Sequence, residues 1–187
     1  MHRKPLLHLL ALYQKSLLVT QEEQAMLAHA IAFVKNASDC FDRSNRYGHI
    51  CGSALILNAA KDSCLLMHHK KLDRWLQLGG HADGQFDILD VALKEGFEES
   101  GIGGLVPLLP TFFDIDVHCI PERLEVPAHF HFDIRFLLIA PEGAVPVQNH
   151  ESKAICWIKL SEVTTLTQER SVLRLVEKVI SGIKKQM

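Results

Sequence analysis

A short segment with glycines near both of its ends places the strongest constraint on the fold of this 187-residue chain. Leu78–Ile102 opens with a Gly-Gly pair, continues through a polar loop, and then has the pattern of a helix of about four turns that stops at Gly101. Glu95, Glu98 and Glu99 stand at positions i, i+3 and i+4 of that helix, so their carboxylates project from one face. Like charges at this spacing repel by roughly a few tenths of a kcal/mol per pair, so we expect a compensating partner.

A divalent cation is a natural partner for three crowded carboxylates. Mg²⁺ takes carboxylate oxygens at about 2.0–2.1 Å, keeps several waters, and is often shared with substrate phosphates. The alternative is a solvated acidic helix end that binds nothing. The glutamates alone leave both interpretations open.

The wider spacing resembles the Nudix box, Gly-x5-Glu-x7-Arg-Glu-U-x-Glu-Glu-x-Gly-U, in which U is a bulky aliphatic residue. Within residues 80–102 the matching positions are Gly80, Glu95, Glu98, Glu99, Gly101 and Ile102. The departures are Phe86 in place of Glu, Lys94 in place of Arg, and Gly96 in place of the aliphatic residue. Asp87 or Asp90 could give Lys94 a substitute ion pair. The chain is thus similar to the Nudix hydrolase superfamily, with an altered box.

The resemblance implies an α/β fold, an α/β/α sandwich in which the box helix packs against a mixed β-sheet. The box is specific, whereas the similarity is loose over residues 48–160. We expect residues 1–38 to form an N-terminal helical extension and residues 39–187 to form the Nudix-like hydrolase domain.

Two helices are predicted in the extension. An apolar stripe through Leu6, Leu10, Tyr13 and Leu17 predicts the first, over residues 5–18. Thr20, followed three residues later by Glu23, forms a capping box and predicts a second helix that ends near Asn36. We expect the two to form an antiparallel hairpin that packs on the main body or, alternatively, on a second copy in a homodimer.

Alternating polarity predicts strands in the rest of the chain. Strands are expected over 49–58 and 63–69, and an amphipathic helix over 168–184. Two later strands, 112–119 and 128–140, each place polar residues on one face. These residues are Asp114, Asp116 and His118 on the first strand and His129, His131, Asp133 and Arg135 on the second. We expect the two strands to pair.

We interpret this shared polar face as the floor of a pocket for a phosphorylated substrate; the alternative is a half-buried strand pair that simply faces water. Arg135 could bind phosphate through its forked guanidinium, and His131 lies on the same face. The basic and aromatic segment HHKKLDRWLQLGG, interpreted either as an exposed loop or as a rim of the site, adds Arg74 and Gly80 as candidates for substrate contact.

The resemblance also implies an activity. Nudix enzymes cleave a diphosphate linkage in nucleoside diphosphate derivatives, acting on phosphoanhydride bonds with Mg²⁺ or Mn²⁺. Glu95, Glu98 and Glu99 would bind the metal. Glu95, Glu98 or the loop residue Glu151 would act as the general base, and Lys94 would orient the glutamates by its charge.

The three box departures motivate an alternative of another class. In it, the chain is a catalytically weak or inactive Nudix-like module that binds a nucleotide and acts through protein contacts. A third possibility, an isopentenyl diphosphate isomerase, needs a catalytic cysteine motif, and the sequence HICGSA around Cys51 does not resemble one.

Composition limits the partners and the compartment. With a net charge of -2, we expect no nucleic-acid polymer as partner. His8 and Gln14 interrupt the N-terminal leucines, which argues against a signal peptide. No apolar run approaches the ~20 residues that span a bilayer, so we expect a cytoplasmic protein that does not associate with a membrane. The five cysteines form no CxxC pair and are expected to be reduced core residues. A structural zinc site is not favoured, although the histidine-rich strands could contribute ligands.

Overall fold

The computed structural model describes residues 2–123 and 126–186. Contacts between residues divide the chain into two compact units. Unit 1 comprises Met1–Ser53, Gly79–Ala92 and Leu109–Phe136, and unit 2 comprises Ala54–Leu78, Leu93–Leu108 and Leu137–Met187. The predicted division into residues 1–38 and 39–187 stays a prediction.

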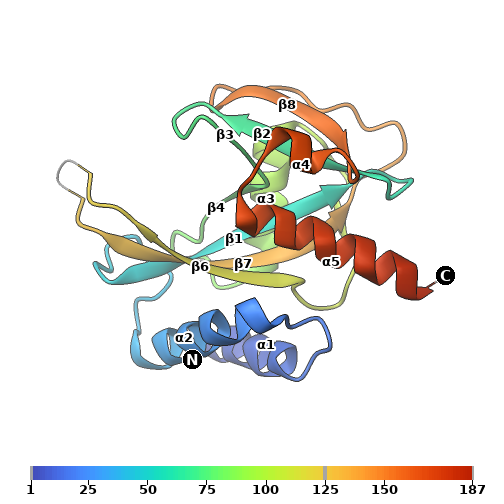
Figure 1. Cartoon of the computed structure of the whole chain (residues 1–187). Coiled ribbons are helices and arrows are strands. Elements are labelled where there is room, and N and C mark those ends of the chain that lie inside the picture. Colours follow the sequence, from blue (N-terminus) through green and yellow to red (C-terminus); the bar gives the residue numbers. More distant parts are fainter. Residues whose placement is uncertain (1, 124–125, 187) are drawn as a thin grey trace. The chain divides into compact units, whose positions relative to one another are not determined.

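Strands and helices together make an α/β fold, as predicted (Figure 1). The strands are β1 (Gly48–Leu57), β2 (Ser63–His69), β3 (Arg74–Leu76), β4 (Leu78–His81), β5 (Val106–Pro107), β6 (Asp114–Ile120), β7 (His129–Ile139) and β8 (Ser152–Lys159). The helices are α1 (Lys4–Gln14), α2 (Gln21–Asn36), α3 (Ile88–Ser100), α4 (Val163–Leu166) and α5 (Arg170–Gln186). In the described part of the chain, eight strands join in one sheet with the path β3-β2-β1-β7-β5, and β4 pairs with β1, β6 with β7 and β8 with β2.

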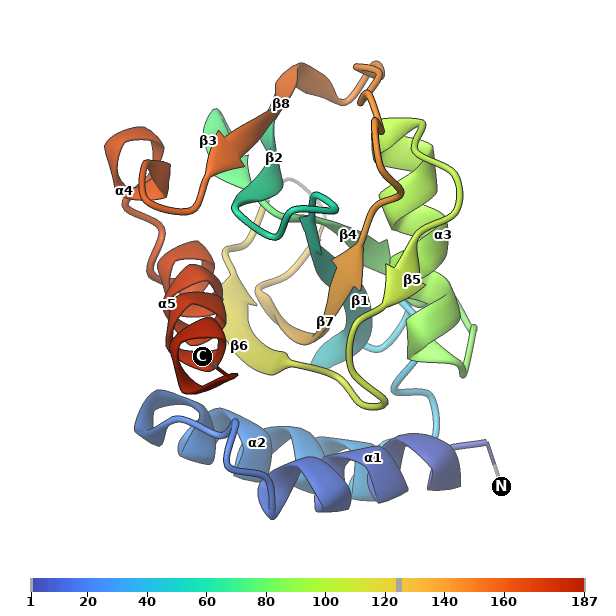
Figure 2. The ribbon, with the colours of Figure 1, turned by 90° about the vertical axis from the view of Figure 1, so that its right-hand side faces the viewer.

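Unit 1 contains the predicted pair of N-terminal helices, α1 and α2, which lie side by side in Figure 2. The capping box at the start of α2 is present, because the Glu23 carboxylate accepts the backbone N–H of Thr20 at 2.9 Å. The helical hairpin is therefore confirmed.

The first helix is shorter than predicted. Leu6, Leu10 and Tyr13 are buried as the apolar stripe requires, but α1 ends at Gln14. Leu17 is 100% exposed, because the chain turns here. In this turn the hydroxyl of Ser16 accepts the backbone N–H of Leu18 at 3.1 Å. The extension of the stripe to Leu17 is therefore wrong.

A buried tyrosine and glutamate connect these helices to β6. The Tyr13 hydroxyl lies 2.6 Å from Oε1 of Glu23 and 2.8 Å from the backbone oxygen of Phe113. The same Oε1 accepts the backbone N–H of Ile115, in β6, at 3.2 Å. Both side chains are 0% exposed. The glutamate that caps α2 therefore also docks this helix on a strand of the sheet.

The predicted pairing of the two polar strands in unit 1 is confirmed. The strands β6 and β7 are antiparallel, in the register Asp114 to Arg135, Asp116 to Asp133 and His118 to His131. Because directly opposed residues share a face of the sheet, the acidic and histidine side chains of the two strands lie side by side, as expected.

Unit 2 contains the end of β1, residues 54–57, and the strands that pair around β2. The predicted hairpin of β1 and β2 is confirmed by the pairs Ile56 to Leu65 and Leu57 to Cys64. Residues 68–80, the segment HHKKLDRWLQLGG, are not simply an exposed loop, because they contain β3, which pairs with β2. This pairing stacks Trp75 on His68 at 5.1 Å between ring centroids. The C-terminal amphipathic helix is present as α5, whose buried apolar residues in the described part are Val172, Leu175, Val176 and Val179.

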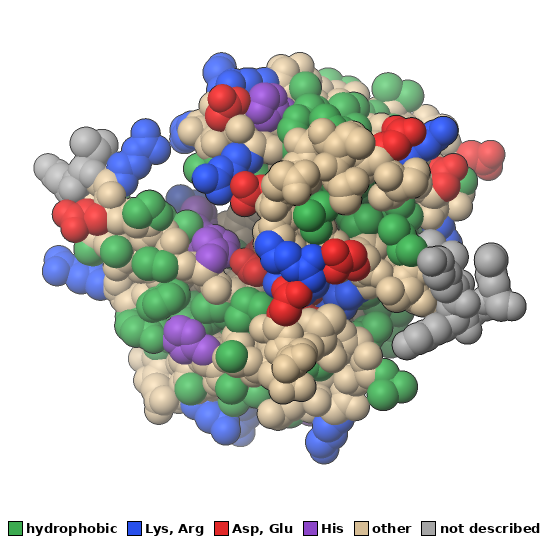
Figure 3. Space-filling view, viewed as in Figure 1, with side chains coloured by type: hydrophobic (Ala, Val, Ile, Leu, Met, Phe, Trp, Pro, Cys, Tyr) green, Lys and Arg blue, Asp and Glu red, His purple; other side chains and the backbone are tan. Residues whose placement is uncertain are grey.

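The surface carries charges of both signs. In unit 2, Arg74 lies 3.2 Å from Glu169, and Arg170 lies 2.7 Å from Glu177. Acidic and basic side chains also lie next to each other at several places on the face drawn in Figure 3. No helix in the described ranges is both long enough and apolar enough to span a bilayer.

Candidate functional site

The predicted glutamate helix is α3. It begins after Asp87, whose Oδ1 accepts the backbone N–H groups of Leu89 and Asp90 at 3.1 and 3.4 Å. It ends before Gly101, whose φ of +69° is left-handed and is adopted by glycine without strain. The predicted helix is confirmed, and its geometry puts the three box glutamates on one face.

The three glutamates differ in their exposure to solvent. The side chain of Glu98 is 52% exposed and that of Glu95 is 17% exposed, while Glu99 is 5% exposed. Lys94 Nζ lies 3.4 Å from Oε1 of Glu95 and 3.2 Å from Oε2 of Glu98. Because the Lys94 side chain is 63% exposed, solvent screens both contacts, and each is worth at most about 1 kcal/mol.

The environment of Glu95 disfavours its charged form. Burial raises the pKa of the Glu95 carboxyl above its ordinary value, and the negative charges of Glu98 and Glu151 raise this pKa further, while Lys94 opposes both effects. Glu151 therefore acts electrostatically on the same carboxyl as the box residue Glu98.

Hydrogen bonds join the Glu151 loop to the end of α3 within unit 2. Asn149 donates its amide N–H to the backbone oxygen of Glu98 at 3.4 Å, and the Val147 N–H donates to the backbone oxygen of Ser100 at 2.7 Å. The Glu151 side chain is 48% exposed. The loop thus lies against the helix turn that carries the glutamates, with the Glu151 carboxylate open to solvent.

This donor set fits a hard divalent cation. Carboxylate oxygens are the ligands that Mg²⁺ and Mn²⁺ prefer. The repulsion and burial that raise the pKa of Glu95 are the effects that a bound cation would offset. Glu95, Glu98, Glu99 and Glu151 could therefore hold Mg²⁺ or Mn²⁺, and their assignment as ligands stays a prediction.

Local packing accounts for the glycine inside α3. A Cβ atom built on Gly96 would lie 2.9 Å from Cδ1 of Leu105 and 3.4 Å from Cδ1 of Ile56. Leu105 thus occupies the space that a larger side chain at position 96 would need. Alanine at this position would have to displace Leu105, so it would not gain the full advantage of roughly 1 kcal/mol that it has over glycine in a helix interior.

The other two departures also have local partners. Phe86 stacks on His2 at 4.7 Å and meets Phe41 edge-on at 5.5 Å between ring centroids, so aromatic packing replaces a charge at this position. Lys94 lies against Glu95 and Glu98, so the expected substitute pair with an aspartate is wrong. Asp87 caps the helix instead.

Two of the predicted substrate contacts are arginines that already have acidic partners. Arg74 is exposed and lies 3.2 Å from Glu169. Arg135 is 0% exposed, and its Nε donates to Oδ1 of Asp114, also 0% exposed, at 2.8 Å. Arg135 would therefore have to leave a buried ion pair to reach a phosphate. Both assignments stay predictions.

The remaining two candidates lie in unit 1. Gly80 is a partly exposed residue of β4, and His131 is a partly exposed residue of β7. The ring of His131 lies 4.8 Å from that of His49 and 4.9 Å from that of His81, between centroids. The roles of Gly80 and His131 in binding substrate stay predictions.

Sequence reasoning missed how many potential ligands surround His131. His49, Cys51 and His81 converge with it, and one ligand atom from each of the four lies within 4.8 Å of the others. Burial, followed by the positive charge of neighbouring histidines, lowers the pKa of His49 to about 4 and that of His131 to about 2. In the sequence, the one local sign of this cluster is that His49 and Cys51 stand two residues apart, which places both on the same face of a strand.

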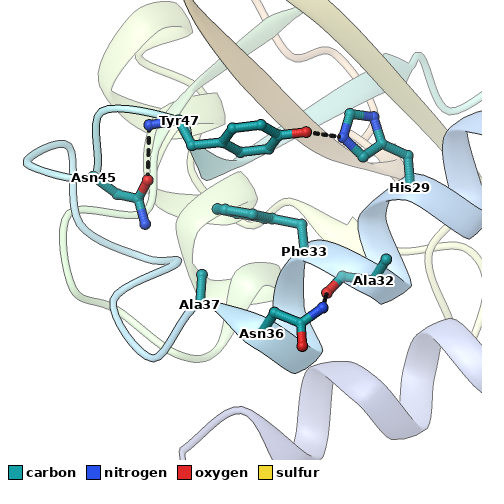
Figure 4. A pocket seen from close by; sticks show the side chains of 7 residues that line it. All are labelled: His29, Ala32, Phe33, Asn36, Ala37, Asn45 and Tyr47. Atoms are coloured by element: carbon teal, nitrogen blue, oxygen red, sulfur yellow. Dashed lines mark hydrogen bonds between the residues drawn. The ribbon is translucent and has the colours of Figure 1, made fainter.

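A pocket of about 330 Å³ in unit 1 has a different character. Figure 4 shows Phe33 and Tyr47 in it, with the Tyr47 hydroxyl 2.6 Å from a ring nitrogen of His29. Its lining consists of His29, Ala32, Phe33, Asn36, Ala37, Asn45 and Tyr47. These residues supply apolar, aromatic and amide groups, with no Lys or Arg, so the pocket lacks the cationic groups that bind a diphosphate.

Comparisons with known proteins agree with this architecture. A family model described as NUDIX domain matches residues 49–176. The fold is similar to that of a NUDIX-family hydrolase from Clostridium perfringens, at 21% identity and a TM-score of 0.53, over 70% of this chain and 95% of that chain. It is also similar to a C. elegans Ap4A hydrolase, at 16% identity and a TM-score of 0.54, over 74% and 98% of the two chains.

A third similar structure is the E. coli dihydroneopterin triphosphate pyrophosphohydrolase, at 18% identity and a TM-score of 0.56, over 71% of this chain and 95% of that chain. A comparison with curated proteins found no match. At these identities the structures establish the fold, an α/β arrangement with a mixed sheet.

Proposed function

The chain belongs to the NUDIX domain family, and on that premise we propose that it is a metal-dependent hydrolase that cleaves a diphosphate linkage in a nucleoside diphosphate derivative. The observation that carries the proposal is the carboxylate cluster in unit 2. Three glutamates share one face of α3, and the charge of Glu151 reaches one of them, Glu95. A bound cation would offset the burial and the like charges that disfavour the charged form of Glu95.

Each residue of the cluster has a distinct role in this proposal. Glu95, Glu98 and Glu99 would hold Mg²⁺ or Mn²⁺, which when bound would stabilise charge on the phosphoryl oxygens and lower the pKa of a water molecule. Lys94 Nζ lies 3.4 Å from Glu95 and 3.2 Å from Glu98, and its charge would orient the two carboxylates.

The general base would be Glu151 or Glu95. Glu151 is exposed and lies on a loop bonded to α3, so it can reach solvent water. Glu95 has a raised pKa, which brings its basicity closer to that of an effective proton acceptor at neutral pH. Comparison of the two single Gln variants, in their pH profiles for kcat, distinguishes the two carboxyls.

The experiment is an assay of pyrophosphohydrolase activity with Mg²⁺ or Mn²⁺. The substrate panel includes nucleoside triphosphates, ADP-ribose, dinucleoside polyphosphates such as Ap4A, dihydroneopterin triphosphate and coenzyme A. Glu98→Gln should lower kcat/KM by about 100-fold or more, which is at least the loss typical of residues that support a metal ligand. Glu177→Gln is the matched control, because Glu177 is an exposed glutamate on another helix. Full activity in Glu98→Gln would refute the assignment.

The altered box favours a second candidate, a module that binds a nucleotide without hydrolysing it. Phe86, Lys94 and Gly96 are the observations behind it. Calorimetric binding of a nucleotide from the same panel, without turnover under either metal, would favour this candidate over the hydrolase.

A further inference from the structure

Four potential metal ligands from three paired strands converge in unit 1. His49 and Cys51 stand two residues apart on β1, so the alternation of a strand puts both side chains on one face. His81 belongs to β4 and His131 to β7, and both of these strands neighbour β1 in the sheet. Ligand atoms of all four residues lie within 4.8 Å of one another.

The separations suit a tetrahedral metal site. Zinc binds nitrogen at about 2.0–2.1 Å and sulfur at about 2.3 Å, so the ligand atoms of a tetrahedral site with three nitrogens and one sulfur are about 3.3–3.6 Å apart. Nε2 of His81 and Nε2 of His131 are 3.4 Å apart, which is already within that range. No separation in the set is larger than 4.8 Å, so the ligand atoms would have to move closer by at most about 1.2 Å, a shift that side-chain rotations can supply.

His49 supplies an independent reason to expect a ligand. Its side chain is 3% exposed, and neither Nδ1 nor Nε2 of its ring has a hydrogen-bond partner among the residues that the structure describes. Leaving a buried polar group unsatisfied destabilises the folded state. A bound metal ion would satisfy one nitrogen of this ring, and burial keeps the ring in the neutral form that binds metals.

We propose that His49, Cys51, His81 and His131 form a closed Zn²⁺ site that ties β1, β4 and β7 together. Three imidazoles and one thiolate are the nitrogen and sulfur donors that zinc selects. Four protein ligands complete a tetrahedral coordination shell, so the ion is structural rather than catalytic. The set contains none of the box glutamates, whose oxygen donors select Mg²⁺ or Mn²⁺, so the proposal does not depend on the hydrolase activity. It does replace the predicted substrate contact of His131, because a ligand of a closed site would hold the metal instead.

The competing interpretation is a packed group of histidines that holds no metal. His129 belongs to this group, since its ring lies 5.1 Å from that of His49 and 5.2 Å from that of His131, between centroids. Within the described ranges, ring packing alone leaves both nitrogens of His49 without a hydrogen-bond partner, whereas a metal ion would satisfy one of them.

The test is the metal content of the full chain. The protein is loaded with Zn²⁺, exchanged into metal-free buffer without chelator, and analysed by mass spectrometry for metal per chain. We expect about one zinc per wild-type chain. Cys51→Ser and His49→Gln should lose most of it. Cys119→Ser and His150→Gln are the matched controls, because both residues are exposed and lie outside the set, and they should keep the zinc.

Two further measurements keep the test decisive if a variant folds poorly. Replacement of zinc by Co²⁺ in the wild-type chain should give the absorption bands of tetrahedral cobalt with a thiolate ligand. A chelator should lower the thermal unfolding midpoint of wild type and of Glu98→Gln by a similar amount. A wild-type chain without stoichiometric zinc, or a cobalt spectrum without a thiolate band, would overturn the proposal.

Discussion

Replacing Tyr13 by Phe removes the hydroxyl group that joins α1, α2 and β6. That hydroxyl lies 2.6 Å from Oε1 of Glu23, and both side chains are 0% exposed, so no water can replace the lost hydrogen bond. A hydrogen bond to a charged group contributes about 1.5–3 kcal/mol, and this one is short. We therefore expect Tyr13→Phe to lower the free energy of unfolding by about 2–3 kcal/mol. For a chain of this size, the unfolding midpoint should fall by about 4–12 °C.

The same contact predicts a dependence on alkaline pH. Burial, then the hydrogen bond to Glu23 and its charge, hold the pKa of Tyr13 far above its usual value. The folded state keeps the phenol proton, while the unfolded chain loses it above a pH of about 10. The contribution of Tyr13 to stability is therefore complete below a pH of about 10 and is lost above it, by about 1.4 kcal/mol per pH unit. Tyr13→Phe should remove this part of the slope.

Urea denaturation, followed by circular dichroism at pH 7 and again above pH 10, measures both effects. Tyr47→Phe is the matched control, because it removes a hydroxyl that lies 2.6 Å from a ring nitrogen of His29 but belongs to a residue that is 53% exposed. That change should cost less than about 1 kcal/mol, since water replaces the partner. Equal effects of the two substitutions, or an unchanged alkaline slope in Tyr13→Phe, would show that the buried contact does not anchor the helices.

Two further substitutions test buried contacts in unit 1. Arg135→Ala leaves the carboxylate of Asp114 buried without its cation and should lower the free energy of unfolding by about 3–5 kcal/mol, measured by urea denaturation; a loss below about 1 kcal/mol would contradict the buried pair. Gly79→Ala would place a Cβ atom 2.1 Å from Cβ of Ser53 and should strongly reduce the yield of folded protein, measured by the recovered soluble fraction. Folded Gly79→Ala protein of wild-type stability would show that these strands can move apart.

Local patterns in the sequence predicted much of the fold. The capping box at Thr20 and the left-handed Gly101 mark helix ends that depend on residues within one turn. The alternation in β6 and β7 predicted their shared polar face, because each strand encodes its own two sides. The roles of Glu95 and the other box glutamates stay predictions, since residue spacing shows where the side chains point and not what binds there.

Features that depend on long-range contacts were missed. His49, His81 and His131 come from three strands, and their meeting depends on strand order, which no local period encodes. The buried ion pair of Arg135 with Asp114 was missed for a similar reason. A polar residue on a strand gives the same sequence pattern whether its side chain faces water or another charged group. The exposure of Leu17 shows that an apolar period can continue beyond the end of a helix.

The stacking of Phe86 on His2 has a practical consequence for biochemical work on this protein. Phe86 precedes α3 in the box, while His2 stands at the start of the described chain and also lies 3.1 Å from the backbone oxygen of Ser38. A purification tag fused ahead of His2 would emerge beside the loop that leads into the glutamate helix. Kinetic constants should therefore be measured on protein with a C-terminal tag, or after the N-terminal tag has been cleaved.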